Sequence, residues 1–154
     1  VVMLVRASAA AARQTLIDIT RSDGQGSILL RLVYLAPDKA LSVFYRDQEG
    51  KYRQARADAD LTKPSIIVVR RNKRVINITV ATAEKSADIP EEHALGDFED
   101  TTYVTTVGAT WDGERFTDYL TGDVVELHIY NQALSDDRMF QVINSLRDTY
   151  LELQ

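Results

Sequence analysis

Short apolar runs separated by turn signals are the feature of this chain that most limits its fold. Runs of strand length occur at residues 1–5, 16–19, 28–34, 41–46, 52–57, 66–69, 75–80, 104–109 and 124–130. Their side chains alternate or are β-branched, which is typical of half-buried or buried strands. No strand–helix alternation and no repeat of domain-building length accompanies them. The pattern therefore predicts an all-β protein, an antiparallel β-sandwich.

Two segments predict hairpins. In segment 66–80, two β-branched runs flank a polar turn in which Asn72 tolerates the positive φ of a tight reversal. In segment 41–57, residues 47–50 reverse the chain between two alternating runs. Both hairpins would pair strands that are neighbours in sequence.

Two further segments have distinct patterns. Residues 83–102 contain Pro90 and many acids, which indicates a long surface connection. In segment 124–130, alternation predicts that Val124, Glu126, His128 and Tyr130 lie on one face and that the other face carries Val125, Leu127 and Ile129.

The last segment changes to a helical period. Ser135 is a good N-cap, and Asp136 and Asp137 suit the positive end of a helix dipole. Apolar residues then recur at steps of three and four: Met139, Ile143, Leu146, Tyr150 and Leu153. We expect one amphipathic helix over about 135–152 that packs on the outer face or edge of the sandwich.

Length and composition define the broad class. At 154 residues with 45% hydrophobic side chains, the chain suits one domain over residues 1–154. A formal net charge of −5 disfavours nucleic acid as a partner. Charges such as Arg6, Asp18 and Arg31 interrupt the apolar stretches, so membrane insertion is not expected. The chain lacks cysteine, which excludes disulfides. It does not begin with Met, and we expect it to be a fragment of a longer chain.

Residues 119–136, YLTGDVVELHIYNQALSD, resemble the closing segment of the concanavalin A-like lectin/glucanase superfamily in its laminin-G-like and pentraxin-like branch. In that pattern Gly122 opens a strand, Glu126 and Tyr130 share a face, and Leu134-Ser135 leads into a helix. The resemblance implies a jelly-roll sandwich. It also implies that the strand which usually precedes residues 1–5 is missing from this sequence.

Glucanases of that superfamily make catalysis the first function to test. Retaining glycosidases need two carboxyl groups about 5 Å apart, and these glucanases place them as Glu-x-Asp-x-x-Glu on a strand. This sequence has no such array, and its nearest approach, Asp58-Ala59-Asp60, is typical of a turn or an Asx cap. His93 and His128 are too few for zinc without cysteine. Catalysis is therefore not expected, although a polysaccharide hydrolase remains a minor alternative.

Calcium is the one cofactor that the resemblance suggests, because such domains often hold it at the rim of the sandwich. Acids of suitable chemistry are Asp112, Glu114, Asp118 and Asp123, together with Asp97, Glu99 and Asp100. The alternative is that they are solvated surface acids of an acidic protein. Glu126 has its own alternative, as a half-buried carboxylate that accepts hydrogen bonds from its neighbours.

Aromatic and basic side chains are the candidate ligand contacts. The aromatic residues near the last loops are Tyr103, Trp111, Phe116 and Tyr119. Their rings can stack on sugars, or they belong to the core. The basic cluster consists of Arg70, Arg71, Lys73 and Arg74. It suits an anionic glycan or an acidic surface, or it is a solvated hairpin tip.

These observations predict a non-catalytic binding or adhesion module that recognises a glycan or a protein surface. The main alternative is a structural decoration or cement-type subunit of a virus particle or another extracellular assembly, with copies of itself or other subunits as neighbours. Both readings place the chain outside the cell or on a virion surface.

Overall fold

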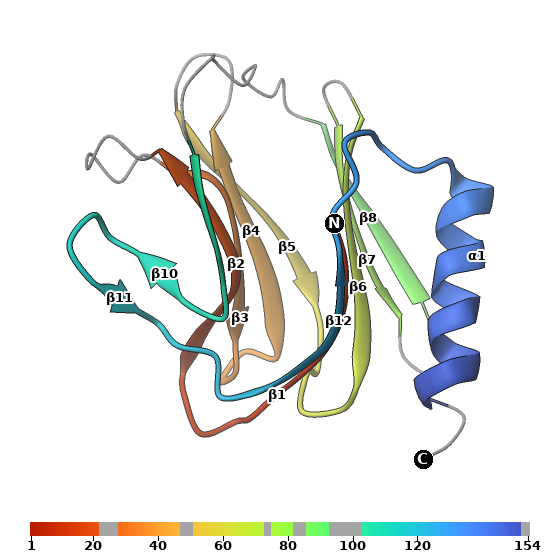
Figure 1. Ribbon diagram of the computed structural model, residues 1–154, viewed down its shortest axis with the longest axis horizontal. Coiled ribbons are helices and arrows are strands. Elements are labelled where there is room, and N and C mark those ends of the chain that lie inside the picture. The colour runs from red at the N-terminus through yellow and green to blue at the C-terminus, as the bar shows by residue number, and fades with distance from the viewer. Residues whose placement is uncertain (22–27, 47–50, 73–74, 82–85, 93–102, 152–154) are drawn as a thin grey trace.

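A computed structural model describes residues 1–21, 28–46, 51–72, 75–81, 86–92 and 103–151. Two five-stranded sheets face each other, and all strand pairs are antiparallel (Figure 1). The fold class predicted from the sequence is confirmed. Among the described residues, no helix is long and apolar enough to cross a membrane.

We call the first layer the helix-side sheet. Its strands, in spatial order, are β12 (Gly122–His128), β1 (Val2–Ala7), β6 (Ser65–Asn72), β7 (Val75–Ala81) and β8 (Ser86–Glu92). We call the second layer the hairpin-side sheet. Its strands are β5 (Tyr52–Asp58), β4 (Ala40–Arg46), β3 (Ile28–Leu35), β2 (Arg13–Arg21) and β9 (Tyr103–Val107).

A short hairpin, β10 (Thr110–Trp111) with β11 (Phe116–Thr117), forms a separate two-stranded sheet. The chain forms β1 in the helix-side sheet and then β2 to β5 in the hairpin-side sheet. It returns to the helix-side sheet with β6 to β8, crosses to the hairpin-side sheet with β9, and ends in the helix-side sheet with β12. Both predicted hairpins are present, since β4 pairs with β5 and β6 pairs with β7.

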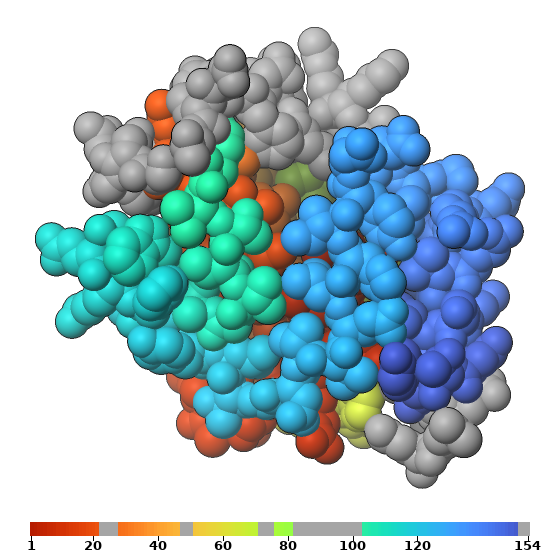
Figure 2. All heavy atoms as spheres, in the orientation of Figure 1, coloured from red at the N-terminus to blue at the C-terminus, as the bar shows by residue number. Residues whose placement is uncertain are grey.

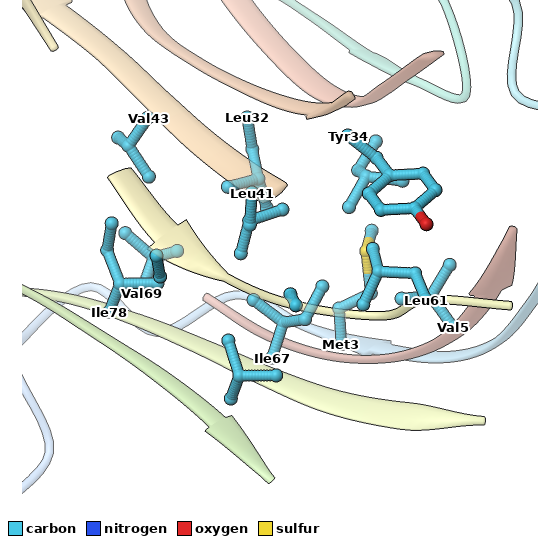
Figure 3. Close-up of a cluster of buried hydrophobic side chains, with 14 of the residues drawn as sticks. Met3, Val5, Leu32, Tyr34, Leu41, Val43, Leu61, Ile67, Val69 and Ile78 are labelled. Carbon is cyan, nitrogen blue, oxygen red and sulfur yellow. The ribbon is translucent and has the colours of Figure 1, made fainter. Parts of the chain in front are cut away.

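The main core lies between the two sheets (Figure 3). Alternation along each strand sends every second side chain inward, where apolar groups leave water. The buried set includes Met3, Val5, Leu32, Tyr34, Leu41, Val43, Leu61, Ile67, Val69 and Ile78. Residues between these on the same strands therefore face outward.

The C-terminal helix packs on the side of the helix-side sheet that faces away from the main core, as predicted. α1 (Asp136–Leu146) begins after Ser135, whose side chain accepts a hydrogen bond from the Arg138 N–H at 3.3 Å. A second cluster forms where Met139, Ile143 and Leu146 pack on Val2, Leu4, Ile66 and Val68. The helix differs from the prediction at its end, because the α-helix stops at Leu146 and a π-helical turn, η1 (Arg147–Leu151), follows it.

Truncation of the helix stripe gives a first prediction. Ile143 is fully buried against the sheet, whereas Phe140 on the same helix is 50% exposed. We expect Ile143→Ala to lower the free energy of unfolding by about 2 kcal/mol and Phe140→Ala to change it by less than about 0.5 kcal/mol. Urea unfolding followed by circular dichroism measures both, and equal effects would contradict the docked helix.

Segment 83–102 is not wholly a connection. Ser86–Glu92 forms β8 at the edge of the helix-side sheet, and Pro90 stands opposite Asn77 of β7. A proline is tolerated in an edge strand because its missing N–H can fall on the unpaired side. The prediction of a surface connection over 86–92 was therefore wrong, and residues 83–85 and 93–102 lie outside the described residues.

The alternation predicted for β12 is broken by a β-bulge. Leu4 stands opposite Glu126 but Val5 stands opposite Val124, so Val125 is an extra residue. Val124 consequently packs against the main core with Leu127, while Val125 is 52% exposed. The expectation that Val124 shares a face with Glu126 was wrong for this reason.

Candidate functional site

The outward-facing side of the hairpin-side sheet carries polar and aromatic groups. Register aligns Thr106, Asp18, Arg31, Phe44 and Gln54 across its five strands. The neighbours of Arg31 and Phe44 on their strands, Leu32 and Val43, belong to the main core, so this row points the opposite way. We call this surface the outer face.

A buried ion pair lies at the centre of the outer face. Asp18 of β2 stands opposite Arg31 of β3. Arg31 donates from Nε to Oδ1 at 2.9 Å and from Nη2 to Oδ2 at 3.0 Å. The Asp18 side chain is 0% exposed and that of Arg31 is 11% exposed. Charges this deeply buried require partners of opposite charge, and Asp18 and Arg31 are partners to each other.

The pair leaves one end of the guanidinium available. Within the described part of the chain, neither a backbone nor a side-chain group bonds to Nη1 of Arg31. Nη1 therefore retains donors for a ligand, and arginine binds planar anions such as carboxylates through such donors.

The β10–β11 hairpin, whose Trp111 N–H donates to Asp18, carries an aromatic pair. Trp111 pairs with Phe116, and their ring centroids are 4.9 Å apart at 53°. At the turn, Oδ1 of Asp112 accepts the N–H groups of Glu114 and Arg115 at 2.9 and 2.8 Å. The hydrogen bond from the Arg115 N–H is the main reason that the pKa of Asp112 lies below its usual value.

The hairpin is attached to the outer face by its first strand. Thr110 shares a hydrogen bond of 2.6 Å with Thr15 of β2, and the Trp111 N–H donates to Oδ2 of Asp18 at 3.1 Å. In space the hairpin lies on the side of this sheet away from the helix-side sheet, and it projects from the body of the molecule opposite α1 (Figures 1 and 2). Trp111 and Phe116 therefore border the outer face.

Further aromatic and polar groups extend the outer face. The Arg13 guanidinium lies over the Phe44 ring, 5.7 Å from its centroid, and also pairs with Asp118 at 3.0 Å. Gln54 donates to Ser42 at 2.9 Å. The surface thus offers rings for apolar stacking together with oriented hydrogen-bonding groups, which is the chemistry that sugars require.

The four acids predicted to bind calcium have separate surroundings. Asp118 pairs with Arg13, Asp123 pairs with Arg6, and Asp112 caps the hairpin turn next to Glu114. In the described ranges, no three His, Asp or Glu side chains are grouped so that they could hold a metal ion. Asp97, Glu99 and Asp100 lie outside the described residues. The structure therefore does not bring the predicted ligands together.

The predicted aromatic contacts are only partly united. Trp111 and Phe116 lie together, and Tyr119, which follows the hairpin, is 61% exposed. Tyr103 stands opposite Arg21 on β9, where alternation from Thr106 turns it toward the other side of the sheet. Trp111 and Phe116 are thus the aromatic pair that the outer face can use.

Of the predicted basic cluster, the structure describes the side chain of Arg70. Arg70 donates from Nη1 to the Leu134 carbonyl at 3.2 Å and to Asp136 at 2.5 Å, so it fixes the approach to α1. Lys73 and Arg74 lie outside the described residues, and Arg71 is described by its backbone alone. Arg70 is therefore a structural residue.

Asp60 and Glu126 both accept hydrogen bonds from neighbouring side chains, as their structural alternatives predict. Asp60 accepts from the N–H and hydroxyl of Thr62, as in an Asx turn, and a hydrogen bond from Lys39 is the main cause that lowers its pKa to about 2. Glu126 bonds to His128 and also to the Tyr150 hydroxyl, which raises the pKa of Tyr150. His93 lies outside the described residues.

Asp18 and Arg31 are the functional candidates that sequence reasoning missed. Each is a lone charge inside an apolar strand, in LIDI and LLRLV. Lone charges in otherwise apolar strands require a partner, and that signal was available. What the sequence could not supply was the register that makes them partners.

Comparison with known proteins identifies the fold. No protein-family model matches the sequence, and no curated protein sequence matches it. Among solved structures, the Ruminococcus gnavus IT-sialidase CBM40, a carbohydrate-binding module, is similar with TM-score 0.67 and 14% identity over 92% of this chain and 79% of that one. The same module bound to α2,6-sialyllactose gives TM-score 0.69 and 14% identity over 92% of this chain and 80% of that one.

A more distant likeness is to the binding domain of botulinum neurotoxin serotype D, with TM-score 0.53 and 10% identity over 94% of this chain and 36% of that one. At these identities the likeness is one of fold. It agrees with the lectin-like jelly roll that residues 119–136 indicate. The laminin-G-like and pentraxin-like branch stays a prediction, as does the expectation that this domain is part of a longer chain.

Proposed function

We propose that this chain is a non-catalytic glycan-binding domain and that the outer face, with the β10–β11 hairpin, holds the glycan. The observation that carries the proposal is an arginine fixed by a buried carboxylate beside an aromatic pair at the sheet border. In such a site the ring faces contact the C–H groups of a sugar while Arg31 binds an oxygen-rich substituent.

We further propose that the glycan carries an acidic sugar. Nη1 of Arg31 retains donors, and a carboxylate is an anion whose geometry a guanidinium matches. The fold neighbours support this choice of ligand, since two of the CBM40 structures are bound to α2,3- and α2,6-sialyllactose. A glycan partner is consistent with an extracellular or virion-surface location. The role in a virus particle stays a prediction.

The test is calorimetric titration with α2,3- or α2,6-sialyllactose, and with lactose as the neutral comparison. We expect sialyllactose to bind more tightly than lactose and to be recovered intact. Arg31→Lys keeps a charge beside Asp18 but loses the planar fork. We expect it to weaken sialyllactose binding by about tenfold or more, because a hydrogen bond to a charged group contributes about 1.5–3 kcal/mol.

Arg6→Lys is the matched control for that substitution. Arg6 lies on β1 of the helix-side sheet, outside the outer face, and pairs with Asp123 at 2.6 Å in an exposed position. Its replacement should leave the affinity unchanged within a factor of about two. Equal affinity for lactose and sialyllactose, or equal effects of the two arginine variants, would contradict the proposed site.

A further inference from the structure

One carboxylate serves both halves of the proposed site. Oδ1 of Asp18 accepts Nε of Arg31 at 2.9 Å. Oδ2 accepts Nη2 of Arg31 at 3.0 Å and also the backbone N–H of Trp111 at 3.1 Å. Asp18 is 0% exposed, so water cannot replace any of these three bonds without entering the sheet–hairpin junction.

The hairpin depends on such anchors for its position. Its two strands are two residues long each and pair through Thr110–Thr117 and Trp111–Phe116. A two-stranded ribbon of this size is not stable alone. The Thr15–Thr110 hydrogen bond fixes the start of the hairpin, but it does not touch Arg31. Among the hydrogen bonds of the hairpin, the one to Asp18 links it directly to the guanidinium.

We infer that Asp18 is a positioning residue that couples the aromatic hairpin to Arg31, so that the domain recognises the acidic group and the adjoining sugar ring as one unit. This rests on the proposed function. Asp18 holds the guanidinium edge-on and sets Trp111 beside it. The distance and orientation between the anion contact and the ring contact are therefore fixed before the ligand arrives, which lowers the cost of binding a ligand that matches both.

When Asp18 is altered, the Arg31 contact to the acidic group and the Trp111 contact to the sugar ring should therefore weaken together. Asp18→Asn keeps the volume, but its amide nitrogen cannot accept a hydrogen bond. In place of Oδ2 it deprives both the Trp111 N–H and Nη2 of Arg31 of their acceptor, and in place of Oδ1 it deprives Nε of Arg31 of its acceptor, so the link between the two halves is broken in either orientation. In the parent, we expect Trp111→Ala to weaken sialyllactose binding about tenfold. In the Asp18→Asn background we expect the same substitution to weaken it less than about twofold.

Fluorescence supplies a second readout that does not need the ligand. Trp111 is the chain's one tryptophan, so its emission reports the hairpin alone. We expect Asp18→Asn to shift that emission to the red and to raise its quenching by acrylamide, with an unchanged far-ultraviolet circular dichroism spectrum. Thr15→Val with Thr110→Val is the control, because it replaces both partners of the other anchor and leaves Asp18 in place; its emission should shift less than that of Asp18→Asn.

The outcomes separate the two proposals. If the parent does not bind sialyllactose, the proposed function fails, while the Trp111 emission still tests the coupling. If Trp111→Ala costs the same factor with and without Asp18→Asn, or if the emission is unchanged, the coupling is overturned. Should Asp18→Asn not fold, Arg31→Lys replaces it. Coupling predicts that the Trp111 amide resonance shifts in Arg31→Lys and stays in place in Arg6→Lys, and an unshifted resonance in Arg31→Lys would overturn the coupling.

Discussion

Replacing Asp18 with alanine is expected to lower the free energy of unfolding by about 3–5 kcal/mol, because it leaves the buried Arg31 without its partner. The same change removes the acceptor of the Trp111 N–H. Chemical denaturation at neutral pH measures the loss. If Asp18→Leu is combined with Arg31→Met, most of the stability should return, since no charge then stays buried.

The control for this prediction is an ion pair at the surface. Asp123 accepts from Arg6 at 2.6 Å, and both side chains are more than half exposed, at 56% and 57%. Asp123→Ala should cost at most about 1 kcal/mol. A loss at Asp18 no larger than the loss at Asp123 would show that the pair at the centre of the outer face is solvated, and the site described above would be wrong.

Gly122→Ala is expected to lower the free energy of unfolding by about 3 kcal/mol, because there is no room for a side chain where β12 begins beside β1. A Cβ at Gly122 would lie 2.1 Å from the Arg6 carbonyl oxygen and 2.9 Å from the Ala7 Cα, both of them backbone atoms, at a φ of +155°. Backbone atoms cannot move aside without separating β1 from β12.

Gly108→Ala is the matched control. Its φ of +77° also favours glycine, but the nearest atom to an added Cβ is the Leu120 Cβ at 3.6 Å, an ordinary contact. We expect a cost of about 1 kcal/mol from the backbone conformation alone. Thermal unfolding of both variants compares them, and a Gly122 variant as stable as the Gly108 variant would contradict the close approach of β1 and β12.

Local patterns were sufficient for most of the elements. Alternation and β-branched runs predicted β1 to β7, β9 and β12, and a three- and four-residue period predicted the helix, because these signals arise from neighbours in sequence. β8 escaped prediction because a proline is acceptable only at a sheet edge, and edge position follows from topology. The bulge at Val125 escaped because it is visible only against the partner strand.

The candidate site was harder to predict, because its contacts are distant in sequence. Asp18 and Arg31 are 13 residues apart and meet through the register of β2 and β3, while Thr15 and Thr110 are 95 residues apart. The sequence singles out Trp111 as a ring near the last loops, but the face that it borders depends on those pairings. The acids around it were close in sequence, and each found a separate partner.

Amide chemical-shift mapping during titration with sialyllactose tests the central claim most directly. The account predicts that the perturbed resonances gather on β2, β3 and β4 around Asp18, Arg31 and Phe44, and on the hairpin at Trp111 and Phe116. Perturbations confined to α1 and the helix-side sheet, with the outer face unchanged at saturating ligand, would contradict it.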